Sequence, residues 1–352
     1  MFENHRYDAG RLDDAAWRAS FALDDAFGWD VLKSAHMTAA ACSAMFINGI
    51  ADCKVAIERM SVLQAIEFMR GVAGNVLRDR GRQYLSAAFN INVPIVDDRA
   101  SKTAPELIVD RLEIARLGVE IAHRGGFDKV TWDGASNEVP SVPLTEQLGH
   151  DGLLSVVHAA HSLGLETYIS AGMKAEHMRA ACAVGVDGVG IGTSLHYRDA
   201  ESGLMGALKP DAIAGVLDVR DAAAATPLGV AAKALARLDR MHFEGSLRSE
   251  DEAARERLYE ALAKEDVAKC NAELASLGHV VAMPDNSGEH PLLAAAERIV
   301  AMRRRDERSL RLGTMEDDRR SWFLGRVGEG LRSRDVATIE EAFEMLRGIN
   351  AW

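Results

Sequence analysis

Short apolar runs alternate with amphipathic stretches through the middle of the chain. Four of the runs have the length of strands and end at glycine or polar residues, namely 83–92, 127–133, 165–171 and 186–191. Between them, apolar residues at helical spacing predict helices over 105–123, 150–163 and 174–184. This alternation predicts βαβ units and a parallel sheet, either in a barrel or in an open doubly wound arrangement.

Outside this region the pattern is mostly helical. Residues 11–80 predict helix, including a long one from Asp52 to Arg78, although segment 40–50 is compatible with a short strand. Further helices are predicted over 211–240, 249–276, 291–311, 315–332 and 335–348. The expected fold class is α/β, with two parts. Residues 1–220 form a TIM-like (β/α) barrel, in complete, incomplete or modified form and with a helical N-terminal part. Residues 221–352 form an α-helical extension that serves packing or homo-oligomerisation.

The composition narrows the class of protein. The chain has 352 residues, 48% of them hydrophobic, and a formal net charge of -12. An acidic protein repels phosphate backbones, so nucleic acid is not an expected partner. The four cysteines show neither a C-x-x-C nor a zinc spacing, which favours free thiols in a reducing compartment. Neither a signal peptide nor a bilayer-spanning run is recognisable, so we expect a cytoplasmic enzyme that does not bind membranes.

The strand predicted over 127–133 carries the first candidate chemistry. Side chains alternate along a strand, so Lys129, Thr131 and Asp133 share one face. A polar face is unusual in a parallel sheet and would point into the lumen of a barrel. Burial there would lower the pKa of Lys129, whose free amine would attack a carbonyl while Asp133 moves protons. Alternatively, Lys129 begins the strand, reaches solvent and pairs with Asp128.

Two glycine-containing strand ends predict an anion site. Residues 170–174 read SAGMK and residues 185–194 read GVDGVGIGTS. Glycine lets the backbone approach a ligand, and backbone N–H groups bind anions. In barrels, the loops after the last two strands frequently hold phosphate in this way. The expected binding residues are Ser170, Gly172, Gly192, Thr193 and Ser194. Alternatively, these are tight turns in which glycine serves packing only.

Together these segments resemble the closing strands of the archaeal-type class I fructose-bisphosphate aldolases and related phosphate-binding (β/α)8 barrels. Residues 129–134 (KVTWDG) are similar to the family's K-[TV]-x-[WY]-x-G strand. Residues 171–174 (AGMK) are similar to its A-G-G-x-K turn, and residues 185–195 to its phosphate loop. The resemblance covers about residues 127–217. It implies a Schiff-base lysine at Lys129 and phosphate contacts at Gly172 and Gly192.

The sequence departs from that family at several positions. Met173 stands where a second glycine is usual, Thr193 where an arginine is usual, and Asp128 where an apolar residue is usual. The family's tyrosine motif is not recognisable in residues 87–94. The reaction therefore stays open between cleavage, condensation, dehydration and isomerisation.

Further polar residues lie near the ends of the predicted strands. Asn90 and Asn92 alternate, so both would face the lumen and orient a substrate, or else form an ordinary polar strand exit. Tyr168 shares a face with Ser170 and is a candidate proton donor, or else a core tyrosine with a bonded hydroxyl.

Three functions are compatible with these residues. The first is a Schiff-base lyase or synthase acting on a small phosphorylated carbonyl substrate, with Lys129 as nucleophile and no cofactor. The second is a cofactor-free isomerase or a metal-dependent lyase on a phosphorylated substrate, in which Lys129 and Asp133 act as acid and base; no metal-ligand motif is recognisable. The third is a non-catalytic barrel scaffold that acts through its helical C-terminal region.

Overall fold

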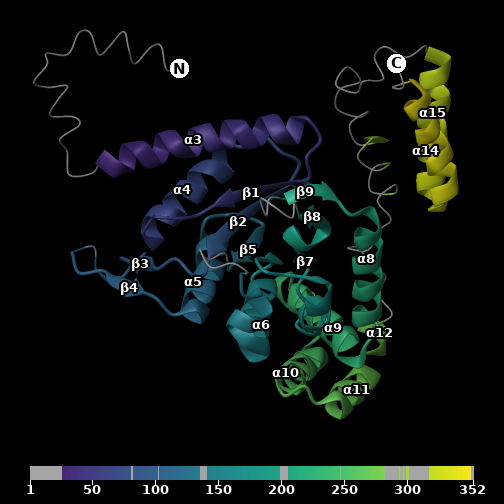
Figure 1. The fold of residues 1–352 in the computed structure, drawn as a ribbon. Helices are drawn as coiled ribbons and strands as arrows, with labels where there is room; N and C mark the ends of the chain where they lie inside the picture. The colour runs from purple at the N-terminus through teal and green to yellow at the C-terminus, as the bar shows by residue number, and fades with distance from the viewer. Residues whose placement is uncertain are drawn as a thin grey trace, which may run out of the picture. The chain divides into compact units, whose positions relative to one another are not determined.

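The computed structural model describes residues 26–80, 82–101, 103–134, 141–198, 205–245, 247–281 and 317–349, together with Leu293, Ala296, Ile299 and Val300. Figure 1 shows the order of the helices and strands. The chain divides into two compact units, residues 1–281 and 282–352, each of which is described by itself.

The first unit is built on a five-stranded sheet. Its strands are β1 (Asp52–Ala56), β2 (Tyr84–Asn90), β5 (Lys129–Asp133), β6 (Glu166–Ser170) and β7 (Gly188–Val189). They lie in the order β1-β2-β5-β6-β7, and every neighbouring pair is parallel. The predicted α/β class and parallel sheet are therefore confirmed. Among the described residues the sheet remains open, and a closed barrel is not formed.

Four helices follow the strands in turn: α4 (Val62–Asn75), α5 (Arg111–Arg124), α6 (Leu144–Ser162) and α7 (Met178–Ala183). Each packs against the next, α4 on α5, α5 on α6 and α6 on α7, so all four cover the same face of the sheet. The strand residues on that face are mostly apolar, and Leu85, Phe89, Val130, Trp132 and Ile169 are fully buried, with Thr167 as a buried polar residue among them. The indole of Trp132 donates to the Ala115 carbonyl of α5 at 3.0 Å. Most polar residues of the strands are thereby left on the opposite face.

Side-chain caps explain where two of these helices begin. Ser61 and Gln64 form a capping box at the start of α4, and the Asp98 carboxylate accepts from the Ser61 hydroxyl at 2.6 Å. Asp110 caps α5 by accepting from the Glu113 N–H at 2.9 Å. Helix α5 therefore begins at Arg111, and the helix predicted over 105–123 starts too early.

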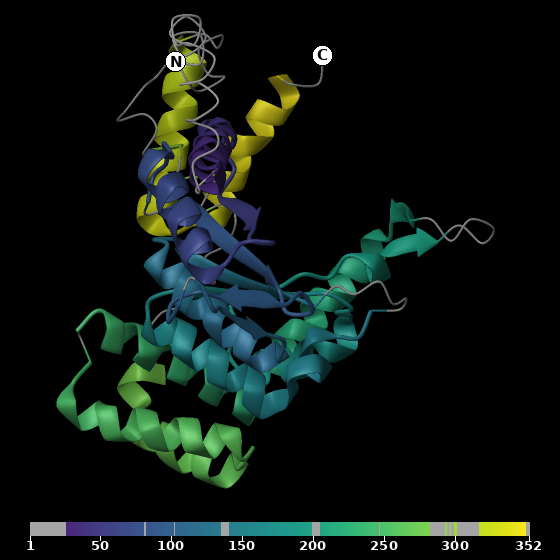
Figure 2. The same cartoon turned by 90° about the vertical axis from the view of Figure 1, so that its left-hand side faces the viewer.

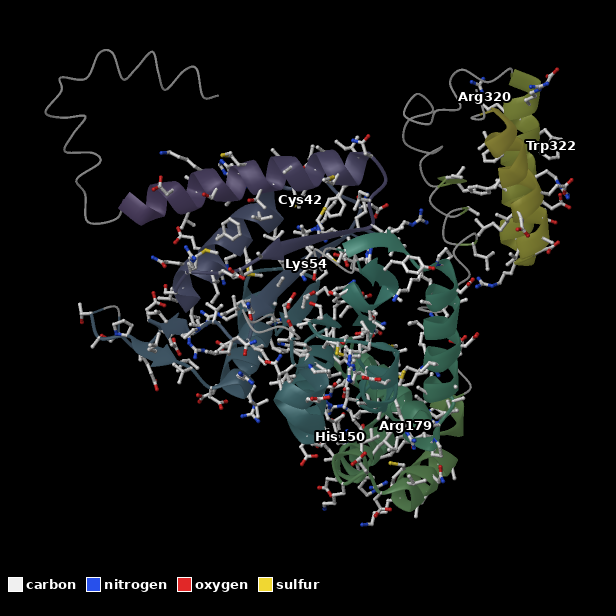
Figure 3. All side chains as sticks on the ribbon, in the orientation of Figure 1. Cys42, Lys54, His150, Arg179, Arg320 and Trp322 are labelled. Atoms are coloured by element: carbon white, nitrogen blue, oxygen red, sulfur yellow. The ribbon has the colours of Figure 1, made fainter. Side chains whose placement is uncertain are left out.

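Additional helices surround this core. Helix α3 (Ala26–Ile47) packs along α4 and contributes Cys42 to the buried core (Figure 3). Helices α8 (Pro210–Ala224), α9 (Pro227–Phe243), α10 (Ser249–Ala263), α11 (Val267–Ser276) and α12 (Gly278–Val281) follow the sheet. Because α9 packs on both α6 and α7, the helices up to residue 281 belong to the same unit as the strands. The predicted domain boundary at residue 220 thus lies within this compact unit.

Two small antiparallel hairpins complete the first unit. Strands β3 (Ile95–Asp97) and β4 (Glu106–Ile108) form one, and β8 (His196–Arg198) and β9 (Met205–Leu208) form the other. Figure 2 shows the second hairpin extending beyond the edge of the sheet. The apolar patterning did not predict either hairpin, because their strands are only three or four residues long.

The second unit contains a helical pair, α14 (Asp317–Ser333) and α15 (Val336–Ile349). Phe323 and Val327 of α14 pack against Ile339 and Ala342 of α15, and all four are fully buried. Trp322 of the same helix is 43% exposed (Figure 3). The helices predicted over 315–332 and 335–348 are confirmed, whereas that over 291–311 lies largely outside the described residues.

The first strand of the sheet differs from the predicted structure. Residues 52–56 form strand β1, although a helix was predicted from Asp52 to Arg78. The apolar residues of α4 lie at helical spacing. Because β1 is only five residues long and precedes α4 closely, its apolar residues fit the same helical pattern. Segment 40–50 is helical up to Ile47. No described helix has both the length and the apolar character that a membrane span requires.

Candidate functional site

A cleft of about 1390 Å³ lies over the polar face of the sheet. Its floor is formed by side chains of β1, β2, β5 and β6, and its rim by the loops that follow β6 and β7. Eight of the ten predicted site residues line it: Lys129, Asp133, Tyr168, Ser170, Gly172, Gly192, Thr193 and Ser194. In parallel α/β sheets, ligands bind at the carboxyl ends of the strands, where most of these residues lie.

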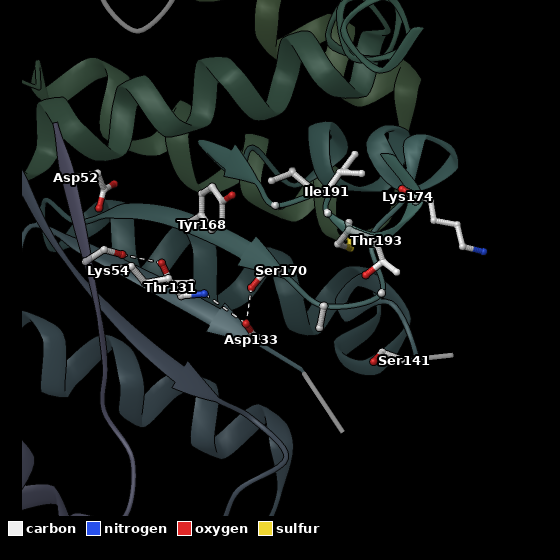
Figure 4. Close-up of a pocket in the computed structure, with 18 of the residues that line it drawn as sticks. Asp52, Lys54, Thr131, Asp133, Ser141, Tyr168, Ser170, Lys174, Ile191 and Thr193 are labelled. Carbon is white, nitrogen blue, oxygen red and sulfur yellow. Dashed lines mark hydrogen bonds and ion pairs between the residues drawn. The ribbon is translucent and has the colours of Figure 1, made fainter. Parts of the chain in front are cut away.

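Asp133 is the centre of the polar contacts at the carboxyl end of the sheet. Its Oδ2 atom accepts a hydrogen bond from the Ser170 hydroxyl at 2.8 Å. The same oxygen lies 3.3 Å from the Nζ atom of Lys54, which reaches across from β1 (Figure 4). Asp133 therefore brings an ammonium group and a hydroxyl group together at this end of the sheet.

Lys54 is a residue that the sequence analysis missed. It lies at the middle of β1, in register with Ser86 of β2, and its side chain is 46% exposed in the cleft. The signal that would have found it is the alternation Asp52-Cys53-Lys54, which places two charged side chains on one face of a strand. That alternation was hidden by the helix assigned to this segment.

The floor of the cleft between the two lysines is made of hydroxyl groups. Ser86 of β2 and Thr131 of β5 are both 1% exposed, and their hydroxyl oxygens lie 2.6 Å apart. Burial of two polar side chains is stable here because each satisfies the other. Thr131 thus lies on the polar face of β5 with Lys129 and Asp133, as the alternation predicted.

Lys129 points towards the amino end of the sheet. Its Nζ atom lies 2.6 Å from Asp52 Oδ2 and 3.3 Å from Glu166 Oε2, and it stands over the ring of Tyr84. Burial acts to lower the pKa of Lys129, but the two carboxylates outweigh it and raise this pKa above its ordinary value. The expectation of a lowered pKa is therefore wrong, because a carboxylate lies on either side of the amine. The predicted alternative partner, Asp128, is bound instead by Arg78.

Tyr168 of β6 lies in the cleft beside these charged residues (Figure 4). Burial raises the pKa of its phenol, and the negative charges of Asp52 and Asp133 raise it further, against a lowering effect of Lys129. Among the described residues, the hydroxyl makes no hydrogen bond to the protein. The phenol is therefore held in its protonated form and is accessible to a ligand.

Backbone conformation distinguishes the loop after β6. Ala171 has φ 80° and Gly172 has φ 62°, so two consecutive residues adopt the left-handed conformation. A side chain at residue 172 would collide with the Ser141 carbonyl, which explains the glycine. Within the described part of the chain, the N–H groups of Gly172 and Met173 donate to no protein acceptor. Successive N–H groups in such a turn form a concavity that binds anions.

The loop after β7 lies opposite. Gly192 leads into a single turn of 3-10 helix over Thr193–Leu195, and both Thr193 and Ser194 line the cleft. Lys174 also belongs to the lining, although Figure 4 shows its side chain directed away from Asp133, and its Nζ atom lies 3.4 Å from Glu176. The two glycine loops thus meet at one cleft, as their sequence positions predicted.

The structure places two predicted residues outside the cleft. Asn90 lines a separate, very small pocket with Phe89 and Ile95, and its side chain accepts from the Asn92 N–H at 3.1 Å. The amide of Asn92 donates to the Gly134 carbonyl at 2.7 Å. Both side chains therefore organise the exit of β2, which was the alternative interpretation of this pair.

The sequence matches no known protein-family model and no curated protein. Within the described residues, no group of three or more histidine, cysteine, aspartate or glutamate side chains is arranged to hold a metal ion. The chemistry of the cleft is therefore inferred from its lysines, Asp133, Tyr168 and the two glycine loops.

Proposed function

We propose that the protein is a Schiff-base lyase or synthase that acts on a small carbonyl compound carrying a phosphate group. The observation that carries this proposal is the position of the Lys54 amine, 3.3 Å from Asp133 Oδ2 at the carboxyl end of the sheet. An amine beside a carboxylate that can accept its proton is the pair of groups that imine formation needs.

Lys54 suits the role of nucleophile better than Lys129 does. Lys129 is held by two carboxylates at the amino end of the sheet, and its raised pKa keeps the amine protonated. Among the described residues, Lys54 has one carboxylate neighbour, at 3.3 Å, and its side chain is 46% exposed, against 14% for Lys129. It also reaches the end of the sheet at which the glycine loops lie. The structure thus favours moving the predicted nucleophile from Lys129 to Lys54.

The reaction begins with a proton transfer at this pair. Asp133 takes a proton from the Lys54 ammonium, and the free amine attacks the carbonyl carbon to form a carbinolamine. Protonation of the carbinolamine hydroxyl then releases water and leaves the protonated imine, which withdraws electrons from the adjacent carbon and permits a carbon–carbon bond to break or form there. The Ser170 hydroxyl orients the Asp133 carboxylate for the first proton transfer.

The phosphate group of the substrate is assigned to the two glycine loops. The N–H groups of Gly172 and Met173, which donate to no acceptor in the described ranges, and the hydroxyls of Thr193 and Ser194 offer hydrogen-bond donors. This arrangement fixes one end of the substrate at the rim, so that its carbonyl group lies over the floor of the cleft.

The strand order supports a partial barrel wall. The strands follow one another in sequence, and the four helices α4 to α7 lie on the same face. This arrangement is that of a (β/α) barrel, whereas in a doubly wound sheet helices cover both faces. We propose that the sheet is an open segment of such a wall. The resemblance of residues 127–217 to class I aldolases supports the same chemistry, with the lysine supplied by a different strand.

Borohydride trapping tests this function. Protein is treated with sodium borohydride in the presence of glycolaldehyde phosphate or dihydroxyacetone phosphate, and the adduct is mapped by peptide mass spectrometry. We expect a saturable adduct on Lys54 that Lys54→Met abolishes. Lys33→Met, a substitution on the exposed side of α3, serves as the matched control and leaves the adduct unchanged.

Two outcomes would contradict the proposal in different ways. An adduct on Lys129 that survives Lys54→Met would return the nucleophile to β5. Folded protein that forms no adduct with any small phosphorylated aldehyde or ketone would exclude the imine and favour acid–base isomerisation or a scaffold role.

A further inference from the structure

Strand β7 and the residue that follows it carry glycine at two alternate positions, Gly188 and Gly190, beside Tyr168 of β6. Gly188 is in register with Tyr168 of β6, and the N–H of Gly190 donates to the Ile169 carbonyl at 2.8 Å. Glycine destabilises a strand interior, so its use at two alternate positions indicates a close approach from a neighbour. Neither residue has a positive φ, so backbone conformation does not explain these glycines.

The neighbour is the ring of Tyr168. A methyl group at residue 188 would overlap the Cδ2 and Cε2 atoms of that ring. A methyl group at residue 190 would lie 2.9 Å from the Tyr168 hydroxyl oxygen, 3.1 Å from Tyr168 Cε1 and 3.1 Å from Ser170 Cβ. The ring therefore lies flat along β7, with its side against Gly188 and its hydroxyl over Gly190.

We propose that Gly188 and Gly190 are positioning residues that form a seat for Tyr168 and hold its hydroxyl over the cleft as a proton donor. The hydroxyl makes no hydrogen bond to any described residue, so its proton is available to a ligand. Tyr168 contacts the reacting group, while Gly188 acts only through the ring and Gly190 lies against both the ring and Ser170.

The part of this inference that concerns proton donation rests on the proposed function. During imine formation, the O–H bond of Tyr168 breaks as its proton moves to the carbinolamine oxygen. Water then leaves as the lone pair of the Lys54 nitrogen forms the carbon–nitrogen double bond. The resulting tyrosinate regains a proton from solvent through the open cleft.

The seat itself is tested without any substrate. The ultraviolet absorbance of tyrosinate is recorded against pH for each protein and for the same protein carrying Tyr168→Phe. The difference between the two titration curves gives the pKa of Tyr168. We expect Gly190→Ala to displace the hydroxyl towards solvent and to lower this pKa towards its ordinary value of 10.0. The control Gly215→Ala, where an added methyl group meets no atom within 4 Å, leaves it unchanged.

A second measurement covers the case in which a variant folds poorly. We compare the loss of melting temperature caused by Gly188→Ala in the wild-type background and in a Tyr168→Ala background. If the seat exists, the loss is large in the first background and small in the second, because the overlapping ring has been removed. Equal losses in both backgrounds, or an unchanged Tyr168 pKa in Gly190→Ala, would overturn the seat.

Trapping then separates this inference from the proposed function. We expect Tyr168→Phe and Gly190→Ala to slow adduct formation on Lys54 at least tenfold, with the adduct still reaching completion. Rates equal to that of the wild type would remove Tyr168 as proton donor. If the wild-type protein forms no adduct at all, the proposed function fails, and the pKa and melting measurements still decide whether the glycines seat the ring.

Discussion

The Lys54 amine on β1 and the Asp133 carboxylate on β5 lie 3.3 Å apart, although strand β2 separates the two strands. Lys54 is in register with Ser86 of β2, whereas Asp133 is in register with Asn90, further towards the carboxyl end. The long lysine side chain therefore runs diagonally over β2 to reach the aspartate. Seventy-nine residues separate the pair in sequence, so only the strand order brings them together.

Lys129 is expected to stabilise the sheet rather than to react. Replacing it by methionine leaves the carboxylates of Asp52 and Glu166 without their shared partner. We expect the free energy of unfolding to fall by roughly 1.5–3 kcal/mol, while Lys54 still forms its adduct. Urea unfolding followed by circular dichroism and borohydride trapping of the same variant measure the two effects.

The pH dependence of this contribution has a definite sign. The folded-state pKa of Lys129 is raised above its ordinary value, so the stabilisation is fully present below the unfolded pKa of about 10.4. It is lost as the pH rises through the folded-state pKa. Wild type and Lys129→Met should therefore converge in stability above pH 10.4, and a constant difference there would contradict the ion-pair explanation.

Ser170 is expected to affect the rate of imine formation more than the stability of the fold. Its hydroxyl donates to Asp133 Oδ2 at 2.8 Å, and removing one such bond is worth about 1 kcal/mol. We expect Ser170→Ala to slow trapping on Lys54 by roughly three- to tenfold. Ser155→Ala is the matched control, because the Ser155 hydroxyl binds the Gly152 carbonyl on α6. Equal rates in both variants would show that Asp133 needs no orienting bond.

Much of this cleft could be predicted from local pattern. The alternation of Lys129, Thr131 and Asp133 indicated a polar strand face. The glycines after β6 and β7 indicated that two loops contribute to one binding site. These signals are local because alternation and strand–turn–helix order lie within a few residues of sequence. They placed eight of the ten expected residues around one cleft.

What the sequence could not reveal depends on contacts between distant segments. The partners of Lys129 come from β1 and β6, so the direction of its pKa shift follows from strand order alone. Strand β1 escaped detection because the helical pattern of α4 follows it closely, and Lys54 was missed with it. The role of Gly188 becomes visible only when the Tyr168 ring is placed beside it.

Ala171 is expected to be strained by its backbone conformation. It has φ 80°, a region that disfavours residues with a Cβ atom by about 1 kcal/mol. We therefore expect Ala171→Gly to raise the free energy of unfolding by roughly 0.5–1 kcal/mol. The same change at Ala214, an exposed position inside α8, should instead lower it by about 1 kcal/mol. Urea unfolding measures the free energy of unfolding of both variants. A lower value for Ala171→Gly than for the wild type would contradict the prediction that Ala171 is strained.

Asp187 is expected to make the first unit sensitive to acid. One oxygen of its carboxylate accepts from the Thr167 N–H and the Thr167 hydroxyl, both at 2.8 Å, and lies 2.7 Å from His161 Nε2. Burial acts to raise the pKa of Asp187, but the His161 charge and these hydrogen bonds outweigh it and lower the pKa to about 2. The network ties α6 and β6 to the start of β7.

The stabilisation from Asp187 is present above the unfolded pKa of about 3.9 and is lost as the pH falls towards 2. Because the side chain keeps 26% exposure, solvent screening reduces the effect to on the order of 1 kcal/mol. We expect wild type to lose that amount between pH 5 and pH 2 relative to Asp187→Asn, in urea unfolding monitored by circular dichroism. Asp218→Asn, at an exposed position on α8, should follow the wild-type curve. If the stability of Asp187→Asn shows the same pH dependence as that of the wild type, protonation of Asp187 does not destabilise the fold.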